Sequence, residues 1–416
     1  MELLILGAGY AGVRTAIELD RFLEHHPSGS SVTLVDRNLY HQHLSMLHLA
    51  ATGNAPEQTV AISLDWILRR RNVRFQQGEV QKIEALHRHV VLTDGLILPY
   101  DRLVLALGAE TNYADVPGAR EHTYALHSYH EAMRLYHQIK NSFALAASTA
   151  DPVAKQALLT FIIVGGGFTG VQLAGELAHW AEQLCTHYQL NRFEVQIVLI
   201  ERSGALLKQF GVWASDPALE TLSRRRIEVL LHTSVTAIEA VEKIEAVAGV
   251  AGVAGSAVQQ LRAVRTQDGQ TQNLTFSAAT VVWAGGIRAP QLIAEAGLPV
   301  DRNGRVYVDR YLRVRDQAAI FAIGDCAIVP SPQGPPVLAT ASYAMRQGEH
   351  LARTLLDEIE GKAPHPYIPL DLGQLVSLGP GEGVGNPLGV PLEGLPIALL
   401  KQGVEAWYLT TLEKIF

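Results

Sequence analysis

Cysteine and excess positive charge are both scarce in this sequence. Its two cysteines, Cys185 and Cys326, lie far apart among 416 residues, which excludes a CxxC pair, a zinc quartet and a disulfide framework. The same scarcity excludes a dithiol relay of the kind that disulfide reductases use. The net charge of −7 argues against a nucleic-acid partner, because binding to phosphates normally requires a basic excess.

Long apolar runs are missing as well. We find no uninterrupted apolar run long enough for a membrane-spanning helix, and the apolar start of the chain runs directly into glycines, which argues against a signal peptide. With 48% apolar and 18% charged residues, the composition predicts a globular, reduced protein that faces the cytosol. Its length predicts two or three domains.

A glycine loop follows the first expected strand. Residues 3–6 form a continuous apolar run, which is typical of a parallel strand buried on both faces. The loop Gly7–Gly12 comes next, then an amphipathic helix from Val13, and the strand 31–35 ends at Asp36. Such glycines let the backbone turn tightly and approach a pyrophosphate at a helix N-terminus, while the acid hydrogen-bonds a ribose 2′-OH. This unit therefore predicts a dinucleotide site.

The same unit occurs a second time. A strand at 158–164 leads into the loop Gly165–Gly170, and a later strand, 195–200, ends at Glu201. Two units predict an α/β protein with two Rossmann-like domains, the first holding FAD permanently and the second visited by a nicotinamide cofactor. Because the carboxylate of Glu201 would repel a 2′-phosphate, the sequence favours NADH over NADPH, although Arg202 beside it could soften that preference.

Asp325 is a further candidate at the flavin site. It follows the apolar strand 319–323 and stands between Gly324 and Cys326. In a two-dinucleotide protein this position suits the part of FAD near the ribityl chain and pyrophosphate; the alternative is a helix N-cap. Cys326 has no partner thiol, so we expect it to be a small buried packing residue.

The positions of the two loops set the expected domain boundaries. Residues 1–117 and 286–378 form the two parts of an FAD-binding domain, and residues 118–285 form an NADH-binding domain. Residues 379–416 form a Gly- and Pro-rich linker, over 379–396, and a C-terminal amphipathic helical segment.

Several motifs stand in an order that is typical of one group of flavoproteins. Besides the two loops and Asp36, the chain has Ala106-Leu107-Gly108, Val282-Trp283-Ala284-Gly285-Gly286-Ile287-Arg288-Ala289-Pro290 and Ala322-Ile323-Gly324-Asp325. This set resembles the two-dinucleotide flavoproteins and, more narrowly, the type II NADH:quinone oxidoreductases, which are single-chain peripheral membrane flavoenzymes. The resemblance covers about residues 1–350. It implies hydride transfer from NADH to FAD and then passage of two electrons to a membrane quinone, without proton pumping.

The fingerprints and the resemblance together imply two sets of site residues. The cofactor-binding candidates are Gly7, Gly9, Tyr10, Ala11, Gly12, Asp36, Arg37, His41, Ala106, Gly108, Gly165, Gly167, Phe168, Thr169, Gly170, Glu201, Gly285, Gly286, Gly324, Asp325 and Ala341. The catalytic candidates are Gln172, Ala341, Tyr343, Arg346 and Gln347. By resemblance, the stretch 41–53, which begins at His41, lies on the flavin side.

Two departures from the family pattern bear on the electron acceptor. The family usually has a glutamate, near the nicotinamide and the quinone, where this chain has Gln172. Its quinone-side motif Ala-Gln-x-Ala-x-Gln falls on residues 341–346, where both glutamines are replaced. Gln347 lies one position further on, about 100° around a helix, so Tyr343 and Arg346 could make the missing contacts instead.

Two other functions therefore stay open. One is a soluble NAD(P)H-dependent flavoprotein reductase of a small electron-transfer protein, which would not need the quinone motif. The other is a redox-sensing flavoprotein, in which the NADH-bound state controls a partner and turnover is incidental.

The C-terminal segment predicts contact with a membrane surface. Apolar residues recur at mostly three- and four-residue steps, which places them on one stripe of a helix: Ile397, Leu400, Val404, Trp407, Tyr408, Leu412 and Ile415. Charged residues among them rule out a bilayer span but suit its interface, as does the family's habit of anchoring through this segment. The stripe could instead pack on the flavin domain or form a dimer contact. We expect a peripheral protein on the cytoplasmic side of a cell membrane, with a homodimer left open.

Overall fold

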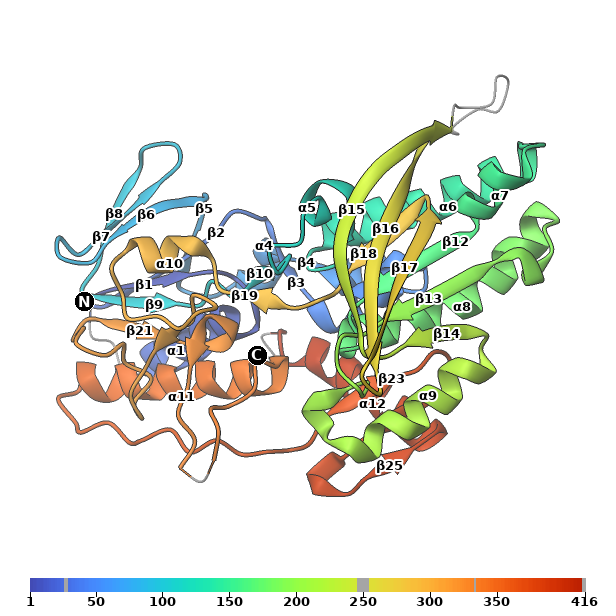
Figure 1. Cartoon of the computed structure of the whole chain (residues 1–416). Coiled ribbons are helices and arrows are strands. Elements are labelled where there is room, and N and C mark those ends of the chain that lie inside the picture. The colour runs from blue at the N-terminus through green and yellow to red at the C-terminus, as the bar shows by residue number, and fades with distance from the viewer. Residues whose placement is uncertain (26–28, 245–253, 333, 414–416) are drawn as a thin grey trace.

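The computed structural model describes residues 1–25, 29–244, 254–332 and 334–413. It has two lobes, each built around a five-stranded sheet, the first at the left of Figure 1 and the second at the right. Both sheets are parallel throughout, and the three inner strands of each are almost completely buried. This is the α/β arrangement that the repeated strand, loop and helix units predict.

The first sheet has the strand order β21-β9-β1-β2-β5. Its strands are β1 (Glu2–Leu6), β2 (Ser31–Asp36), β5 (Val73–Gln77), β9 (Arg102–Leu105) and β21 (Ile320–Ala322). Two long helices, α1 (Tyr10–His25) and α11 (Ala341–Ile359), pack side by side beneath it in Figure 1. A Cβ on Gly348 would lie 2.5 Å from the carbonyl oxygen of Ala11, so a glycine is needed where these helices touch.

The second sheet has the order β11-β18-β12-β13-β14, with the strand before its glycine loop in the centre as in the first sheet. Its strands are β11 (Tyr124–Ala125), β12 (Thr160–Val164), β13 (Gln196–Ile200), β14 (Ile227–Leu230) and β18 (Thr280–Trp283). The helices around it are α6 (Tyr129–Ser148), α7 (Pro152–Leu158), α8 (Phe168–Tyr188) and α9 (Ser215–Arg224).

Each lobe also carries an antiparallel three-stranded sheet. In the first lobe it consists of β6 (Val80–Glu84), β7 (His89–Leu92) and β8 (Ile97–Pro99), and in the second of β15 (Thr233–Ile244), β16 (Ser256–Gln267) and β17 (Gln270–Ala278). Residues 247–257 are of low complexity, and the sequence favours a hairpin tip or an insertion there; 247–253 lie outside the described residues, between β15 and β16.

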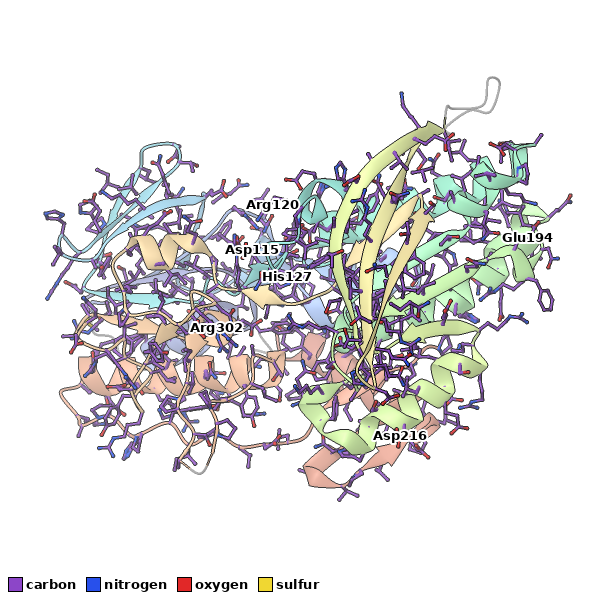
Figure 2. All side chains as sticks on the ribbon, viewed as in Figure 1. Asp115, Arg120, His127, Glu194, Asp216 and Arg302 are labelled. Atoms are coloured by element: carbon purple, nitrogen blue, oxygen red, sulfur yellow. The ribbon has the colours of Figure 1, made fainter. Side chains whose placement is uncertain are left out.

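The two connections between the lobes pair with each other. β10 (Glu110–Thr111) and β19 (Ile287–Arg288) form an antiparallel ladder, and Arg288 Nε lies 2.8 Å from Glu110 Oε1. Asp115, Arg120 and His127 lie at this junction in Figure 2. The first sheet draws its strands from residues 2–105 and 320–322, and the second from 124–283. The exact domain boundaries, at 117, 285 and 378, stay a prediction.

The prediction of a plain linker over 379–396 is wrong. This stretch contains β24 (Gly383–Gly385) and β25 (Leu392–Glu393), which extend β23 (Leu375–Ser377) into a small antiparallel sheet. Glycine makes this possible: a Cβ on Gly385 would lie 2.7 Å from the carbonyl oxygen of Gln374. The final helix, α12 (Leu395–Thr410), packs on β23 and β24 and returns the chain to the middle of the molecule (Figure 1).

Short elements complete the fold. They are β3 (Tyr40–Gln42), α2 (Leu47–Ala51), α3 (Glu57–Val60), β4 (Ala61–Ser63), α4 (Leu64–Leu68), α5 (Ala119–His122), α10 (Gln291–Glu295), β20 (Val306–Tyr307) and β22 (Ala327–Ile328). Of these, β3 and α2 carry the flavin-side stretch, and α2 packs against α6 and α8 of the second lobe. The site is built there.

Candidate functional site

The first glycine loop has the geometry of a dinucleotide cradle. A Cβ on Gly7 would lie 2.3 Å from the carbonyl oxygen of Ala106, and one on Gly12 would lie 1.9 Å from that of Gly7. A Cβ on Gly9, in contrast, would meet no atom of the described residues within 4 Å. The outer glycines thus permit close packing of strand and helix, and the middle one leaves open space where a pyrophosphate approaches the backbone.

The second loop repeats this arrangement. A Cβ on Gly165 would lie 2.2 Å from the carbonyl oxygen of Ala284. A Cβ on Gly170 would lie 1.9 Å from the carbonyl oxygen of Gly165. A Cβ on the middle glycine, Gly167, would have open space around it, with Gln209 Nε2 at 4.0 Å. Phe168 and Thr169 begin α8, so the N-terminus of this helix faces the loop. Both loops therefore fit a dinucleotide.

The two acids are fixed in the same way. Asp36 accepts hydrogen bonds from the backbone N–H groups of Ala8 (2.7 Å) and Asn38 (2.8 Å). Glu201 accepts them from Gly166 (2.7 Å) and Ser203 (2.6 Å). Burial raises the pKa of Asp36, against the lowering effect of these hydrogen bonds and of Arg37. Each carboxylate thus lies beside its loop, where a ribose would be bound.

Further candidates surround the first loop. Ala106 is buried against Gly7, and Gly108 has a positive φ of 65° with open space where a Cβ would stand. Gly285 and Gly286 take the corresponding place beside the second loop, and Gly286 has a φ of 137°. Ala106 and these three glycines follow β9 and β18 at the same edge of each sheet as the loops, so the structure brings all four residues beside the loops.

Gln347 of α11 contacts the turn that carries Asp325. Its buried side-chain oxygen accepts a hydrogen bond from the backbone N–H of Gly324 at 2.7 Å, which fixes the turn that carries Asp325. Burial raises the pKa of Asp325, while His127 and Arg305 lower it. Ala341 begins this helix and Ala344 packs close to Gly324. The sequence did not predict this contact.

Tyr343 and Arg346, also on α11, make different contacts from Gln347. The Arg346 guanidinium donates to the hydroxyl of Ser342 (2.9 Å) and to the carbonyl of Leu370 (2.7 Å), and it lies 5.0 Å from the Tyr343 ring. The catalytic candidates of this helix are thus divided: Gln347 contacts the turn at Gly324, whereas Tyr343 and Arg346 contact the segment 363–372 that follows α11. Their roles stay a prediction.

The C-terminal helix is tied to the flavin-side stretch by a hydrogen-bond chain. His41 Nδ1 lies 2.8 Å from the carbonyl oxygen of Ala8, and Tyr408 Oη lies 2.8 Å from His41 Nε2. Because a carbonyl can only accept, Nδ1 carries the proton and Tyr408 donates to Nε2. The rings of Tyr10, His43 and Tyr408 also touch, with centroids 5.0–6.1 Å apart. The first glycine loop, the flavin-side stretch and α12 therefore interlock.

The prediction of a single apolar stripe on the C-terminal helix needs correction. Ile397, Tyr408 and Leu412 are buried against the body of the protein, whereas Leu400, Val404 and Trp407 are exposed, with Leu395 and Leu399 beside them. Ile415 lies outside the described residues. The reason is that α12 is apolar around most of its circumference, so one face packs inward and the other remains at the surface.

Gln172 and Glu176 form a buried polar pair on α8. They are one helical turn apart and both contact Ser377: its N–H donates to Gln172 Oε1 (3.3 Å) and its hydroxyl to Glu176 Oε1 (3.4 Å). Asn54 donates to Glu176 Oε2 at 3.3 Å. Burial raises the pKa of Glu176. Glu176 was not among the residues predicted from the sequence, although its four-residue spacing from Gln172 on one helix was a usable signal.

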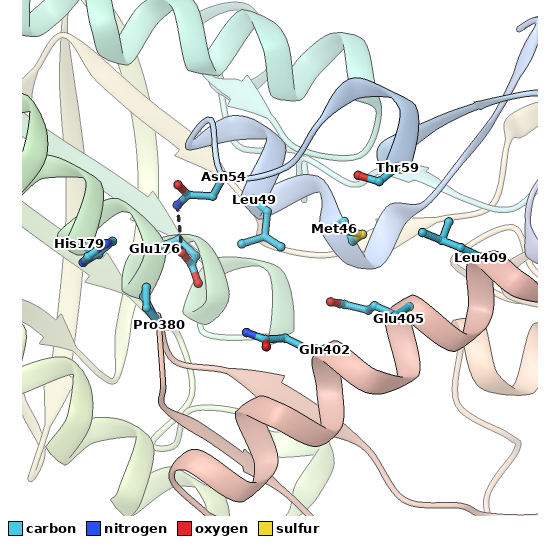
Figure 3. Close-up of a pocket in the computed structure, with 11 residues that line it drawn as sticks. Met46, Leu49, Asn54, Thr59, Glu176, His179, Pro380, Gln402, Glu405 and Leu409 are labelled. Atoms are coloured by element: carbon cyan, nitrogen blue, oxygen red, sulfur yellow. Dashed lines mark hydrogen bonds between the residues drawn. The ribbon is translucent and has the colours of Figure 1, made fainter.

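Glu176 lines a cavity of about 420 Å³ between α2, α8 and α12 (Figure 3). The other lining residues are Met46, Leu49, Asn54, Thr59, His179, Pro380, Gln402, Glu405, Ala406 and Leu409. One wall is thus the flavin-side stretch, a second is the helix that starts at the second glycine loop, and a third is the C-terminal helix. Most of its surface is apolar, with a few polar groups, as is typical of small-molecule sites.

Cys326 is a packing residue, as expected. It is completely buried, and its thiol donates to the carbonyl oxygens of Leu105 and Ile323. Burial raises its pKa to about 12, so the reactive thiolate is strongly disfavoured. Among the described residues, no group of three or more His, Cys, Asp and Glu side chains is placed to hold a metal ion.

Comparison with known proteins bears on this site. The family described as pyridine nucleotide-disulphide oxidoreductase matches residues 1–348. With two dinucleotide loops, this defines the class of the protein as a flavoprotein oxidoreductase whose cofactors are FAD and NADH.

The similarity to one group within that class extends along nearly the whole chain. A type II NADH:quinone oxidoreductase of Staphylococcus aureus is 30% identical over 405 residues, which cover 97% of this chain and 94% of that protein. One from Staphylococcus saprophyticus is 29% identical over the same extents. The chain belongs to the type II NADH:quinone oxidoreductases.

Solved structures show the same fold at lower identity. NDH2 from Plasmodium falciparum in complex with NADH has a TM-score of 0.83 at 19% identity, covering 99% of this chain and 95% of that one. The sulfide:quinone oxidoreductase of Aquifex aeolicus has a TM-score of 0.76 at 16% identity, covering 99% and 91%. These likenesses show the fold alone.

Proposed function

We propose that this protein oxidises NADH and reduces a quinone at the surface of a membrane, without moving protons across it. The observation that carries the proposal is the cavity in Figure 3, which is bounded by the flavin-side stretch and by a C-terminal helix with an apolar outer face. The relatives are named as NADH:quinone oxidoreductases, which supports the choice of NADH and a quinone as substrates. FAD, when bound, supplies the two-electron chemistry that links NADH to an acceptor.

The residues of the chain would bind and orient the cofactors. The glycine loops would hold the two pyrophosphates, with Asp36 and Glu201 bound to the ribose hydroxyls. Asp325, fixed through Gly324 and Gln347, would face the ribityl chain. Hydride transfer requires no protein nucleophile, only a close approach of nicotinamide and flavin.

The outer face of α12 would bind the membrane. Leu395, Leu399, Leu400, Val404 and Trp407 are each more than 40% exposed. Burial of such a side chain in an apolar phase contributes about 1.5–3 kcal/mol, so several together suffice for peripheral binding. Within the described part of the chain, no helix is long and apolar enough to cross a bilayer.

Apolar residues just before α12 would enlarge this surface. Leu388, Val390 and Leu392 are exposed around β25, and Ile368 and Leu370 are exposed in the segment after α11. That segment runs along the lower edge of Figure 1 towards β25. Exposed apolar residues in this number are typical of an interaction surface.

Steady-state oxidation of NADH by a water-soluble quinone tests the proposal. We expect turnover with the quinone and, in liposomes that contain a long-chain quinone, turnover without acidification or alkalinisation of the lumen. Stable binding of NADH with negligible turnover would favour the sensor instead. Turnover with a small electron-transfer protein but with no quinone would favour the soluble reductase.

A further inference from the structure

The cavity beside the flavin-side stretch contains one buried carboxyl group that no role yet explains. Glu176 is only 4% exposed, yet it lines the cavity together with Met46 and Leu49 of the flavin-side stretch and Gln402 of α12 (Figure 3). A carboxyl group is costly to bury in its charged form. Burial therefore raises the pKa of Glu176, against the lowering effect of its hydrogen bonds with Asn54 and Ser377.

Its neighbour on the helix cannot do the same chemistry. Gln172 carries an amide where the family pattern has a glutamate, and an amide, unlike a carboxyl group, is not an acid that can donate a proton near neutral pH. The side chains of Gln172 and Glu176 both contact Ser377 and therefore belong to one polar cluster. The Glu176 carboxyl group lies one helical turn after Gln172 on α8.

We propose that Glu176 is the catalytic acid of this chain, donating a proton to a quinone held in the cavity. This rests on the proposed function. Reduction of a quinone takes two electrons and two hydrogen nuclei. Flavin reduced by NADH would, when bound, supply the electron pair and one hydrogen as a hydride, and Glu176 would supply the second hydrogen as a proton. The products are a hydroquinone, oxidised flavin and the Glu176 carboxylate, which regains its proton from water.

Charged groups around Glu176 suit this cycle. His179 is on the same helix, lines the cavity and is partly exposed. Burial raises the pKa of Glu176, and the hydrogen bond from Asn54 lowers it, as do His179, Arg225 at the end of α9, and Ser377. From α12, Glu405 also lines the cavity, but it forms an ion pair with Lys401.

Glu176→Gln tests the proposal by stopped-flow measurement of the two half-reactions. We expect reoxidation of the flavin by a quinone analogue to slow by about 10²-fold, within the usual range for loss of a general acid. In the wild type this rate should fall as the pH rises through the pKa of Glu176, and in the variant it should become independent of pH. Glu182→Gln, an exposed carboxyl on the same helix, is the matched control and should leave both half-reactions unchanged.

A second variant separates chemistry from packing. Moving the carboxyl back one turn, in Glu176→Gln with Gln172→Glu, should recover at least about tenfold of the loss. Infrared difference spectra on quinone binding should show a carboxylic-acid band that disappears in Glu176→Gln. A variant that retains the wild-type rate, or is slow with an unaltered pH profile, would overturn the assignment. Failure of the proposed function is a different result, since the wild type itself would then reduce no quinone.

Discussion

Asp36 and Glu201 show how a single residue can organise a cofactor loop. Each carboxylate accepts two backbone N–H groups, one from its glycine loop and one from the turn after its own strand. The acid at the strand end was predictable from the sequence. The carboxylate also accepts a hydrogen bond from the N–H of Ala8 or Gly166 in the glycine loop. This second role could not be predicted from the sequence, because it depends on how closely the strand and the loop approach each other.

Glu201 should determine the choice of nicotinamide cofactor. Glu201→Gln removes the charge that opposes a 2′-phosphate but keeps the size of the side chain. We expect the ratio of kcat/KM for NADH to that for NADPH to fall by about 10–100-fold, equivalent to a loss of roughly 1.5–3 kcal/mol for a hydrogen bond to a charged group. Glu220→Gln, exposed on α9, serves as the control. Equal use of both cofactors by the wild type would contradict this role.

Tyr408 should stabilise the flavin site from the far end of the chain. Tyr408→Phe keeps the ring contacts but removes the hydrogen bond to His41 Nε2. We expect a loss of about 1 kcal/mol in the free energy of unfolding and faster release of FAD, because His41 is bound to Ala8 in the first loop. Urea unfolding and recovery of flavin fluorescence measure the two effects. Tyr188→Phe at the end of α8 is the control, and an effect of equal size there would refute the specific role.

At the scale of elements, α12 shows where periodicity stops being informative. A three- and four-residue spacing identifies an apolar helix face but does not state which neighbour covers it. Here the stripe straddles two faces: Ile397 and Tyr408 pack inward, while Val404 and Trp407 remain exposed. The contact of Tyr408 with His41 spans 367 positions in sequence, beyond the reach of any local pattern.

The outer face of α12 can be altered without disturbing the inner one. Replacing Leu399, Leu400, Val404 and Trp407 by serine should abolish flotation with liposomes, because the apolar area that enters the interface is lost. FAD content and turnover with a water-soluble quinone should stay at the wild-type level. As a control, serine at four exposed polar positions of α6 should not change flotation. Continued flotation of the α12 variant would show that another surface binds the membrane.

At the scale of the whole molecule, the repeated fingerprint made the fold predictable from the sequence, but it did not predict all the residues of the site. Two strand, loop and helix units with terminal acids predict two parallel sheets, and the structure has both. The acceptor side is different, since α2, α8 and α12 meet there from three distant parts of the chain. Glu176 and Gln347 acquire their contacts only through that assembly.

Three buried histidines next to the flavin site should make the protein sensitive to acid. Burial lowers the pKa values of His41 and His43 from 6.5 to about 4, and that of His48 well below 6.5. Since the unfolded chain takes up these protons first, stability is present above about pH 6.5 and is lost as the pH falls towards 4. For His41 alone this corresponds to roughly 3 kcal/mol.

Urea unfolding between pH 7 and pH 4.5 measures this loss. Asp36, Glu176 and Asp325 have raised pKa values and contribute with the opposite sign, so the informative quantity is the difference between the wild type and His43→Asn. The variant should lose less stability on acidification. Identical pH dependence in the two proteins would show that His43 does not titrate with unfolding.

The late arrival of β21 has a consequence for how the protein is made. The edge strand of the first sheet, Ile320–Ala322, is synthesised long after its neighbour β9, which ends at Leu105. At ~20 residues per second, a ribosome needs on the order of ten seconds to add the chain between them. The second lobe, contiguous from Tyr124 to Trp283, emerges entirely within that interval. We therefore expect the nascent chain to complete its nicotinamide lobe first, and the flavin lobe to close around its cofactor only near the end of translation.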